Sequence, residues 1–296
     1  MVGGTGVVLA EGSVVRDAEL FVAVDVDAGP QRQRSEARVR LASAVQREWL
    51  ADLYRDALSE QREFVFDEKH GRVVERTQER YGDLILNERV STAVDRQRGG
   101  ELLASLARRA PDKVVPPSPA ERSLLNRMRF LRQWMPELEL PADAEALRAE
   151  AIAMLCPGCS SVAEVGSRDV LAQFRRLLTG AQRRALDQQA PTEFELPSGR
   201  RVAIAYELER PPSVAARIQE LFGLRTMPRL AGGRVALRIE ILAPSQRPVQ
   251  ITDDLESFWR RTYPEVRKQL RRRYPKHAWP EDPLTATTAL RASRRR

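Results

Sequence analysis

Short runs of alternating apolar and polar residues dominate the first 92 residues, and this pattern predicts β-strands. Ala37 to Leu41, for example, alternates apolar and basic side chains, as expected of a strand with one buried face. The predicted elements are strands at 20–26, 37–41, 63–66 and 72–76 and a helix from Val45 to Leu58. This order of strands and helix is typical of an OB-fold barrel. We therefore expect residues 1–92 to form an OB-like β-barrel, and a barrel with a purely structural role fits the pattern equally well.

Helical spacing replaces this alternation between residues 93 and 190. After the proline-rich stretch at 114–119, Ser118 or Pro119 is expected to begin a helix with one apolar face. That face is predicted to turn Leu124, Leu125, Met128 and Leu131 inward. Residues 93–190 are therefore predicted to be a helical segment.

Both periodicities occur between residues 191 and 284, which predicts a mixed α/β C-terminal domain. The predicted elements are strands at 194–196, 201–206 and 235–241 and helices at 213–222, from 252 and from 264. Residues 285–296 are expected to be a basic flexible tail. The fold class that follows is α+β, with an N-terminal OB-like β-barrel, a helical segment and a mixed α/β C-terminal domain.

The composition favours a polyanionic partner and gives no sign of a membrane-spanning segment. The net charge is +8, although 41 acidic residues accompany the 49 basic ones, so the charge is informative only where it clusters. No stretch approaches the roughly 20 apolar residues that span a bilayer, and the N-terminus lacks the pattern of a signal peptide. With only two cysteines there is no disulfide framework. We therefore expect a cytoplasmic protein.

Three short motifs invite a catalytic or metal-binding interpretation. The glycines at 3–6 are not followed by the lysine and Ser/Thr of a phosphate loop, and residues 67–70 resemble a DEAH box only faintly, in a predicted hairpin. Cys156 and Cys159 have the spacing of a zinc or redox pair, but structural zinc needs four ligands and both histidines are distant in sequence. We predict surface turns, structural cysteines, no metal or cofactor, and no catalytic residue in this chain.

A cluster of cationic and aromatic residues near the C-terminal end is the strongest functional signal. Between residues 260 and 276 the basic side chains are opposed only by Glu265. Arginines neutralise phosphates and aromatic rings stack on unpaired bases, so this segment predicts contact with nucleic acid. A solvated or ion-paired face is the alternative. The candidate residues are Arg260, Arg261, Arg267, Lys268, Arg271, Arg272, Arg273, Tyr274, Lys276, His277 and Trp279.

The closing residues 248–283 contain Phe258-Trp259 and the run from Tyr263 to Pro283. This segment resembles the terminal signature of the HrpB family of bacterial DEAH-type ATP-dependent RNA helicases. Residues 196–201, 216–224 and 228–234 resemble further family segments, and 80–86 resembles its OB-type region. The resemblance implies an accessory, nucleic-acid-binding C-terminal region of a helicase.

The ATPase motor of that family is not recognised in this sequence. Family members carry two RecA-like domains, a winged helix and a helical bundle before this region, whereas no Walker A lysine, DEAH box or arginine finger is recognised in this chain. The chain thus resembles the C-terminal part of a helicase, as a separate reading frame or a truncated product. We expect it to be inactive alone, with ATP and magnesium belonging to a motor in cis or in trans.

Three functional hypotheses follow from the sequence. The first is a region that binds single-stranded RNA or DNA. The second is a protein-interaction module that docks a helicase motor or another partner. The third and weakest is a free-standing enzyme or metal protein built on Cys156 and Cys159.

Overall fold

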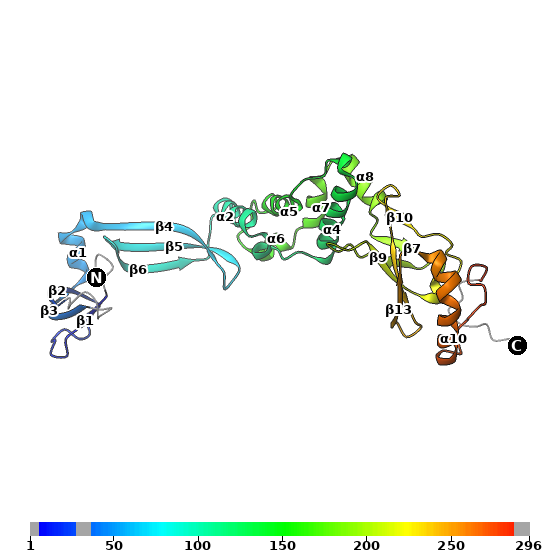
Figure 1. Ribbon diagram of the computed structural model, residues 1–296. Coiled ribbons are helices and arrows are strands. Elements are labelled where there is room, and N and C mark those ends of the chain that lie inside the picture. The colour runs from blue at the N-terminus through cyan, green and yellow to red at the C-terminus, as the bar shows by residue number, and fades with distance from the viewer. Residues whose placement is uncertain (1–5, 28–36, 287–296) are drawn as a thin grey trace. The chain divides into compact units, whose positions relative to one another are not determined.

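The chain divides into two units that interleave along the sequence. The computed structural model describes residues 6–27 and 37–286 (Figure 1). Unit 1 comprises the described chain up to Leu106 together with Cys156–Ser167. Unit 2 comprises Ala107–Leu155 and the described chain from Arg168 onward.

Unit 1 contains two three-stranded sheets. In the first, β3 (Ala37–Val45) lies between β1 (Val7–Leu9), which is parallel to it, and β2 (Leu20–Asp27), which is antiparallel. The second is an antiparallel meander of β4 (Leu58–Asp67), β5 (Arg72–Tyr81) and β6 (Leu84–Ser91). The sheets are connected by α1 (Arg47–Leu53) and a short 3₁₀ turn, and α2 (Arg96–Arg109) follows the second sheet (Figure 1). The later segment of unit 1 contains α6 (Val162–Gly166).

The predicted OB-like barrel is not formed by the residues that the structure describes. A closed barrel requires hydrogen-bonded pairing all the way round, whereas no ladder joins the two described sheets. The side chains of β5 give a physical reason. Glu75, Thr77 and Glu79 lie on one face of this strand, and Arg76 and Arg80 lie on the other, so neither face supplies a continuous apolar interior. The strands predicted at 63–66 and 72–76 are confirmed, as parts of β4 and β5.

The helices of unit 2 follow the apolar pattern of the sequence. Ser118 caps α4 (Pro119–Trp134) by accepting a hydrogen bond from the Glu121 backbone, and Pro119 occupies the first turn, as predicted. The predicted inward residues are buried, namely Leu124, Leu125, Met128 and Leu131. The other helices of unit 2 that precede its first strand are α3 (Pro111–Val114), α5 (Ala144–Ala153), α7 (Val170–Arg176) and α8 (Gly180–Gln189).

Three small sheets follow these helices. They consist of β7 (Glu193–Glu195) with β8 (Arg201–Ala203), β10 (Arg229–Leu230) with β11 (Val235–Ala236), and the sheet β13-β12-β9. In the last of these, β12 (Arg238–Leu242) is parallel to β9 (Ser213–Arg217) and antiparallel to β13 (Pro248–Thr252). The chain then enters α9 (Leu255–Ser257), a π-helical turn (Phe258–Thr262) and α10 (Tyr263–Arg273).

The helix predicted at Ser213–Phe222 is wrong for its first half. This half is strand β9, and a 3₁₀ turn (Ile218–Leu221) follows it. Val214 and Ala216 are buried while Ala215 is exposed, which is the alternation of a strand rather than of a helix. Pairing with β12 determines the outcome, because that partner is supplied by distant sequence that a local pattern does not include.

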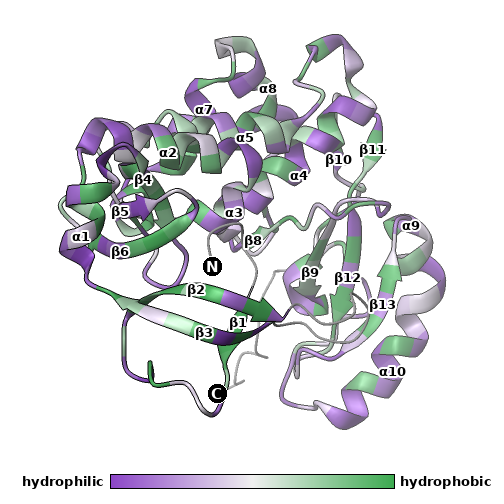
Figure 2. Cartoon of the chain, turned by 90° about the vertical axis from the view of Figure 1, so that its left-hand side faces the viewer, coloured by the Kyte–Doolittle hydropathy of each residue, from purple (hydrophilic) through white to green (hydrophobic). Residues whose placement is uncertain are grey.

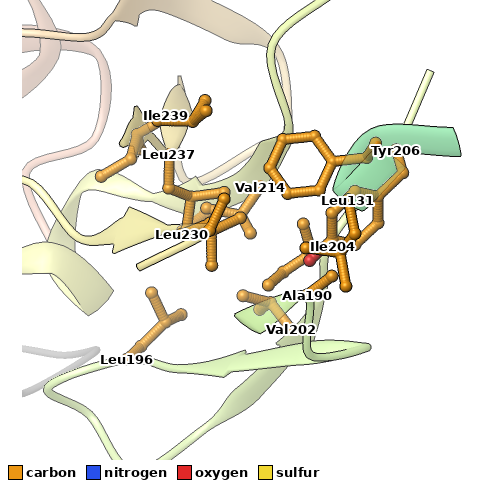
Figure 3. Close-up of a cluster of buried hydrophobic side chains, with 14 of the residues drawn as sticks. Leu131, Ala190, Leu196, Val202, Ile204, Tyr206, Val214, Leu230, Leu237 and Ile239 are labelled. Carbon is orange, nitrogen blue, oxygen red and sulfur yellow. The ribbon is translucent and has the colours of Figure 1, made fainter. Parts of the chain in front are cut away.

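One apolar core links the helices and strands of unit 2. Leu131 of α4, Val202 of β8, Val214 of β9 and Ile239 of β12 converge in it (Figure 3). This core reaches the end of the described chain through Phe258, Trp259 and Tyr263 in the two last helical segments. The basic C-terminal helix is therefore attached to a packed domain.

Candidate nucleic-acid interface

Aromatic side chains anchor one side of α10. The rings of Trp259 and Tyr263 lie 5.3 Å apart and those of Phe222 and Tyr263 lie 6.2 Å apart, both in edge-on geometry. The Trp259 indole donates to the Leu224 carbonyl at 3.0 Å, and the Tyr263 hydroxyl donates to the Pro280 carbonyl at 2.8 Å. Burial of the Tyr263 ring raises the pKa of its hydroxyl, so this group stays a donor at neutral pH. The opposite side of the helix is left to solvent.

Two of the predicted contact residues instead hold the segment that follows α10. Trp279 is 9% exposed, and its indole donates to the Tyr274 carbonyl at 2.9 Å. Arg267 donates to the Trp279 carbonyl at 2.9 Å and pairs with Glu281 at 3.1 Å. Both side chains therefore stabilise the return of the chain along the helix, and the Trp279 ring is not presented for stacking.

The remaining basic residues form a cationic face. The side chains of six of them have no hydrogen-bond or ion-pair partner within residues 6–27 and 37–286, and all six are exposed: Arg261, Lys268, Arg271, Arg272, Arg273 and Lys276. Arg260 differs, because it pairs with Glu256 at 3.3 Å on the surface. Lys268 and Arg272 are one helical turn apart, with Arg271 beside them, so three positive charges share about one turn of α10. We call these six residues the α10 cationic face.

Tyr274 and His277 lie at the C-terminal end of this face. Their rings lie 6.2 Å apart and are nearly perpendicular, at 87°. The Arg273 guanidinium lies 5.8 Å from the centroid of the Tyr274 ring, within the range of a cation–π contact. The Tyr274 hydroxyl lies 2.6 Å from the hydroxyl of Ser245, on the turn between β12 and β13. No feature of the sequence predicts this last contact.

The charge of the chain is divided unequally between the units. Over the full sequence, the ranges of unit 2 hold 34 basic and 21 acidic residues, a net charge of +13, whereas those of unit 1 hold 15 basic and 20 acidic residues, a net charge of −5. The net positive charge of the chain is therefore carried by unit 2.

The same region of the chain matches known proteins. Residues 152–283 match the family model for the ATP-dependent helicase C-terminal region, HrpB_C. The ATP-dependent RNA helicase HrpB of Escherichia coli (strain K12) is 41% identical over 174 residues, which are 57% of this chain and 22% of that protein. The chain is homologous to the C-terminal region of HrpB-type helicases.

Two solved structures extend the similarity to HrpB beyond the matched family range. A crystal structure of the E. coli DExH-box NTPase HrpB covers 90% of this chain with a TM-score of 0.64 and 29% identity. A second, of the E. coli DEAH/RHA helicase HrpB, covers 94% with a TM-score of 0.56 and 28% identity. This chain spans about a third of each of those chains, 33% and 35%. The HrpB-like range includes β9, β12, β13 and the α10 cationic face.

The cysteine pair lies in a tight turn. Gly158 has a φ of +77°, and the Cys159 amide donates to the Cys156 carbonyl at 2.9 Å, so Pro157 and Gly158 occupy the two central positions of a β-turn. Both cysteines are fully buried. A Cβ added at Gly100 of α2 would lie only 2.7 Å from the Cys156 carbonyl oxygen, so the turn packs directly on that helix. No group of three or more His, Cys, Asp or Glu residues suited to a metal occurs in the described chain.

The residues that resemble a DEAH box form a surface turn. The Asp67 carboxylate accepts hydrogen bonds from the backbone amides of Lys69 and His70, and one of its oxygens lies 2.6 Å from His70 Nδ1. The bond with the His70 ring holds the pKa of Asp67 below its usual value. These contacts stabilise the turn between β4 and β5. In the described chain, no helix is long and apolar enough to cross a membrane.

Proposed function

We propose that this chain is an accessory nucleic-acid-binding region of an HrpB-type helicase and that the α10 cationic face contacts the phosphates of single-stranded RNA. The observation that carries the proposal is the set of six exposed cations within the HrpB-like range that have no hydrogen-bond or ion-pair partner among the described residues. Such groups are costly to place side by side unless an anion neutralises them. The relative that shares 41% identity is an RNA helicase by name, which supports RNA as the polyanion.

The chemistry of the face favours contact with the backbone rather than reading of bases. Guanidinium groups donate in a fork that matches phosphate oxygens, and such contacts position a strand without reading its sequence. Trp279 is buried, so we assign stacking on a terminal base to Tyr274, whose half-buried ring lies at the end of the face. The affinity should therefore depend weakly on sequence and strongly on salt.

We assign ATP binding and hydrolysis to a polypeptide segment other than this chain. This chain spans 22% of its curated HrpB relative, and the ATP-binding motor, with its magnesium, belongs in our proposal to a polypeptide segment other than residues 1–296. That motor acts in cis or in trans, in the cytoplasm, and passes a single strand to the α10 cationic face.

Charge reversal on α10 tests the proposal. In the whole chain, Lys268→Glu, Arg271→Glu and Arg272→Glu together should weaken binding of a labelled single-stranded RNA at least about tenfold and flatten its salt dependence. The matched control reverses three exposed arginines of unit 1, Arg55, Arg62 and Arg89, and should leave the salt slope unchanged. Unchanged affinity in a folded α10 variant would contradict the proposal.

A second function is favoured by the surface of unit 1. Ten of the fourteen large apolar residues that are exposed in the described chain lie between Val8 and Val90. They include Trp49, Leu53 and Tyr54 on and beside α1, a helix with no buried residue. Figure 2 shows further apolar residues along β2 and β3. An exposed apolar surface of this kind is typical of a protein-binding site.

The partner for this surface is, in our proposal, the motor region of an HrpB-type helicase. The double variant Trp49→Ser and Leu53→Ser should bind the part of E. coli HrpB that this chain does not cover more weakly than the original chain does. Added salt should not weaken binding of the original chain in the same way, because the contact is apolar. RNA binding should be unchanged in the same variant. Equal binding of this partner by the variant and the original chain would contradict the proposed docking function.

A further inference from the structure

The turn between β12 and β13 meets the C-terminal end of α10. A hydrogen bond between the Ser245 and Tyr274 hydroxyls, 2.6 Å apart, links the turn to the helix end. The turn itself is fixed by its backbone, because Ala243 donates to the Arg247 carbonyl and Gln246 donates to the Ala243 carbonyl, each at 2.8 Å. The two views in Figures 1 and 2 place β13 beside α10. Segments distant in sequence are therefore joined at one end of the α10 cationic face.

Arg247 is the charged residue of this turn. Gln246 before it has a φ of +64°, a left-handed conformation that makes the turn tight. Arg247 is exposed, and within the part of the chain that the structure describes its side chain has no hydrogen-bond or ion-pair partner. No acidic residue occurs from Ile241 to Thr252, so the turn does not neutralise this charge.

The geometry brings Arg247 within reach of the helix end. Two residues of extended chain span at most about 7 Å, so the Arg247 backbone lies close to Ser245 and hence to Tyr274. Tyr274 also contacts Arg273 through its ring and accepts from the Trp279 indole through its carbonyl. Tyr274 thus connects the helix, the returning segment and the turn that carries Arg247.

We propose that Arg247 is a further phosphate-contacting residue of the same surface and that Tyr274 is its positioning residue. The proposal rests on the function assigned to the α10 cationic face and extends it across the β12–β13 turn. A single strand that crosses the end of α10 contacts Arg273 and Lys276 on one side and Arg247 on the other. Tyr274 acts by holding the turn against the helix through Ser245.

Neutralising Arg247 tests the contact. Arg247→Gln in the whole chain should weaken single-stranded RNA binding roughly threefold to tenfold and reduce the slope of log affinity against log salt by about 0.7, the change for one phosphate contact on a single strand. Arg184→Gln is the control, because Arg184 is another exposed arginine of unit 2, located on α8. The control should change neither quantity.

A double-mutant cycle tests the positioning role. Tyr274→Phe keeps the ring and removes the hydroxyl, so it should reproduce a large part of the loss of salt slope seen in Arg247→Gln. In the Arg247→Gln background the same change should have no further effect, because the contact that it positions is already absent. A purely structural role would lower the unfolding midpoint without changing the salt slope.

The outcomes separate this inference from the function on which it rests. If reversal of Lys268, Arg271 and Arg272 weakens binding while Arg247→Gln does not, the α10 cationic face stands and the role of Arg247 is overturned. If neither variant changes binding, the proposed function fails as a whole. Independent, additive effects of Tyr274→Phe and Arg247→Gln would keep the phosphate contact and remove the positioning role.

Discussion

Units 1 and 2 differ in where they place their apolar residues and their charge. The main apolar core lies entirely in unit 2, whereas most of the exposed large apolar residues of the described chain belong to unit 1. The net charge is +13 over unit 2 and −5 over unit 1. A packed, basic unit suits a preformed surface for a polyanion, while an acidic unit with open apolar faces suits a protein partner. The comparison assigns the two proposed functions to different parts of one chain.

The largest expected effect is on stability, and it contrasts the two apolar surfaces. Phe222→Ala removes a fully buried ring that contacts Trp259 and Tyr263, and should lower the free energy of unfolding by about 3–5 kcal/mol. Leu53→Ala on α1, where the residue is 73% exposed, should change it by less than about 0.5 kcal/mol. Urea unfolding measures both. A comparable loss in the two variants would remove the contrast between the units.

A buried ion pair should account for the next largest effect. Arg148 is 0% exposed and donates to Glu121 at 2.7 Å, to Asp112 at 2.9 Å and to the Val115 carbonyl. Arg148→Met leaves the Glu121 carboxylate buried without its cation, which should cost about 3 kcal/mol in urea unfolding. Since this cluster joins α3, α4 and α5, a negligible loss would mean that unit 2 does not depend on it.

Two glycines of unit 1 differ in the space around them, so replacing each by alanine should change stability differently. Gly100→Ala places a Cβ 2.7 Å from the Cys156 carbonyl oxygen, so the backbone must move and about 1–3 kcal/mol of stability should be lost. Gly166→Ala in α6 meets no atom within 4 Å and should be neutral or stabilising by up to about 1 kcal/mol. Thermal unfolding distinguishes the two, and equal midpoints would contradict the close approach of α2 to the cysteine turn.

The smallest expected effect is a pH dependence in unit 2. A hydrogen bond from Arg108 lowers the pKa of Glu150 in the folded chain. The resulting stability is present above the unfolded-state pKa and is lost as the pH falls through the folded-state pKa. Arg108→Ala should therefore reduce stability at pH 7 by less than about 0.5 kcal/mol, because the pair is exposed, and should cause no loss at acidic pH. Unfolding midpoints at the two pH values check this, and an equal loss at both would contradict the sign.

Local patterns predicted the parts of the fold that local interactions determine. The start of α4 at Ser118 and Pro119 and its inward leucines follow from capping chemistry and helical spacing, and both were predictable. The strand at Ser213–Arg217 was not, because its pairing partner β12 is distant in sequence. The prediction of a barrel was wrong for the described residues for a related reason. The order of strands does not reveal that both faces of β5 are polar at its centre.

The candidate site shows the same limit. A sequence count identifies the basic residues between 260 and 276, but not which of them are already used inside the fold. Arg267 and Trp279 make internal hydrogen bonds, while Arg247 belongs to a turn that only the Ser245–Tyr274 contact brings to the helix. Residue type alone therefore does not identify the candidate RNA contacts. They also depend on which side chains make internal hydrogen bonds and on where the fold places each residue.

Mapping where RNA touches the chain shows directly whether the α10 cationic face binds it. The whole chain is crosslinked to a single-stranded RNA that carries 4-thiouridine, and the modified peptides are identified by mass spectrometry. We predict adducts between residues 244 and 279, around α10 and the β12–β13 turn, and none on β4, β5 or β6. Adducts concentrated on the β4–β6 sheet, with none near α10, would show that unit 1 holds the RNA and would contradict the account.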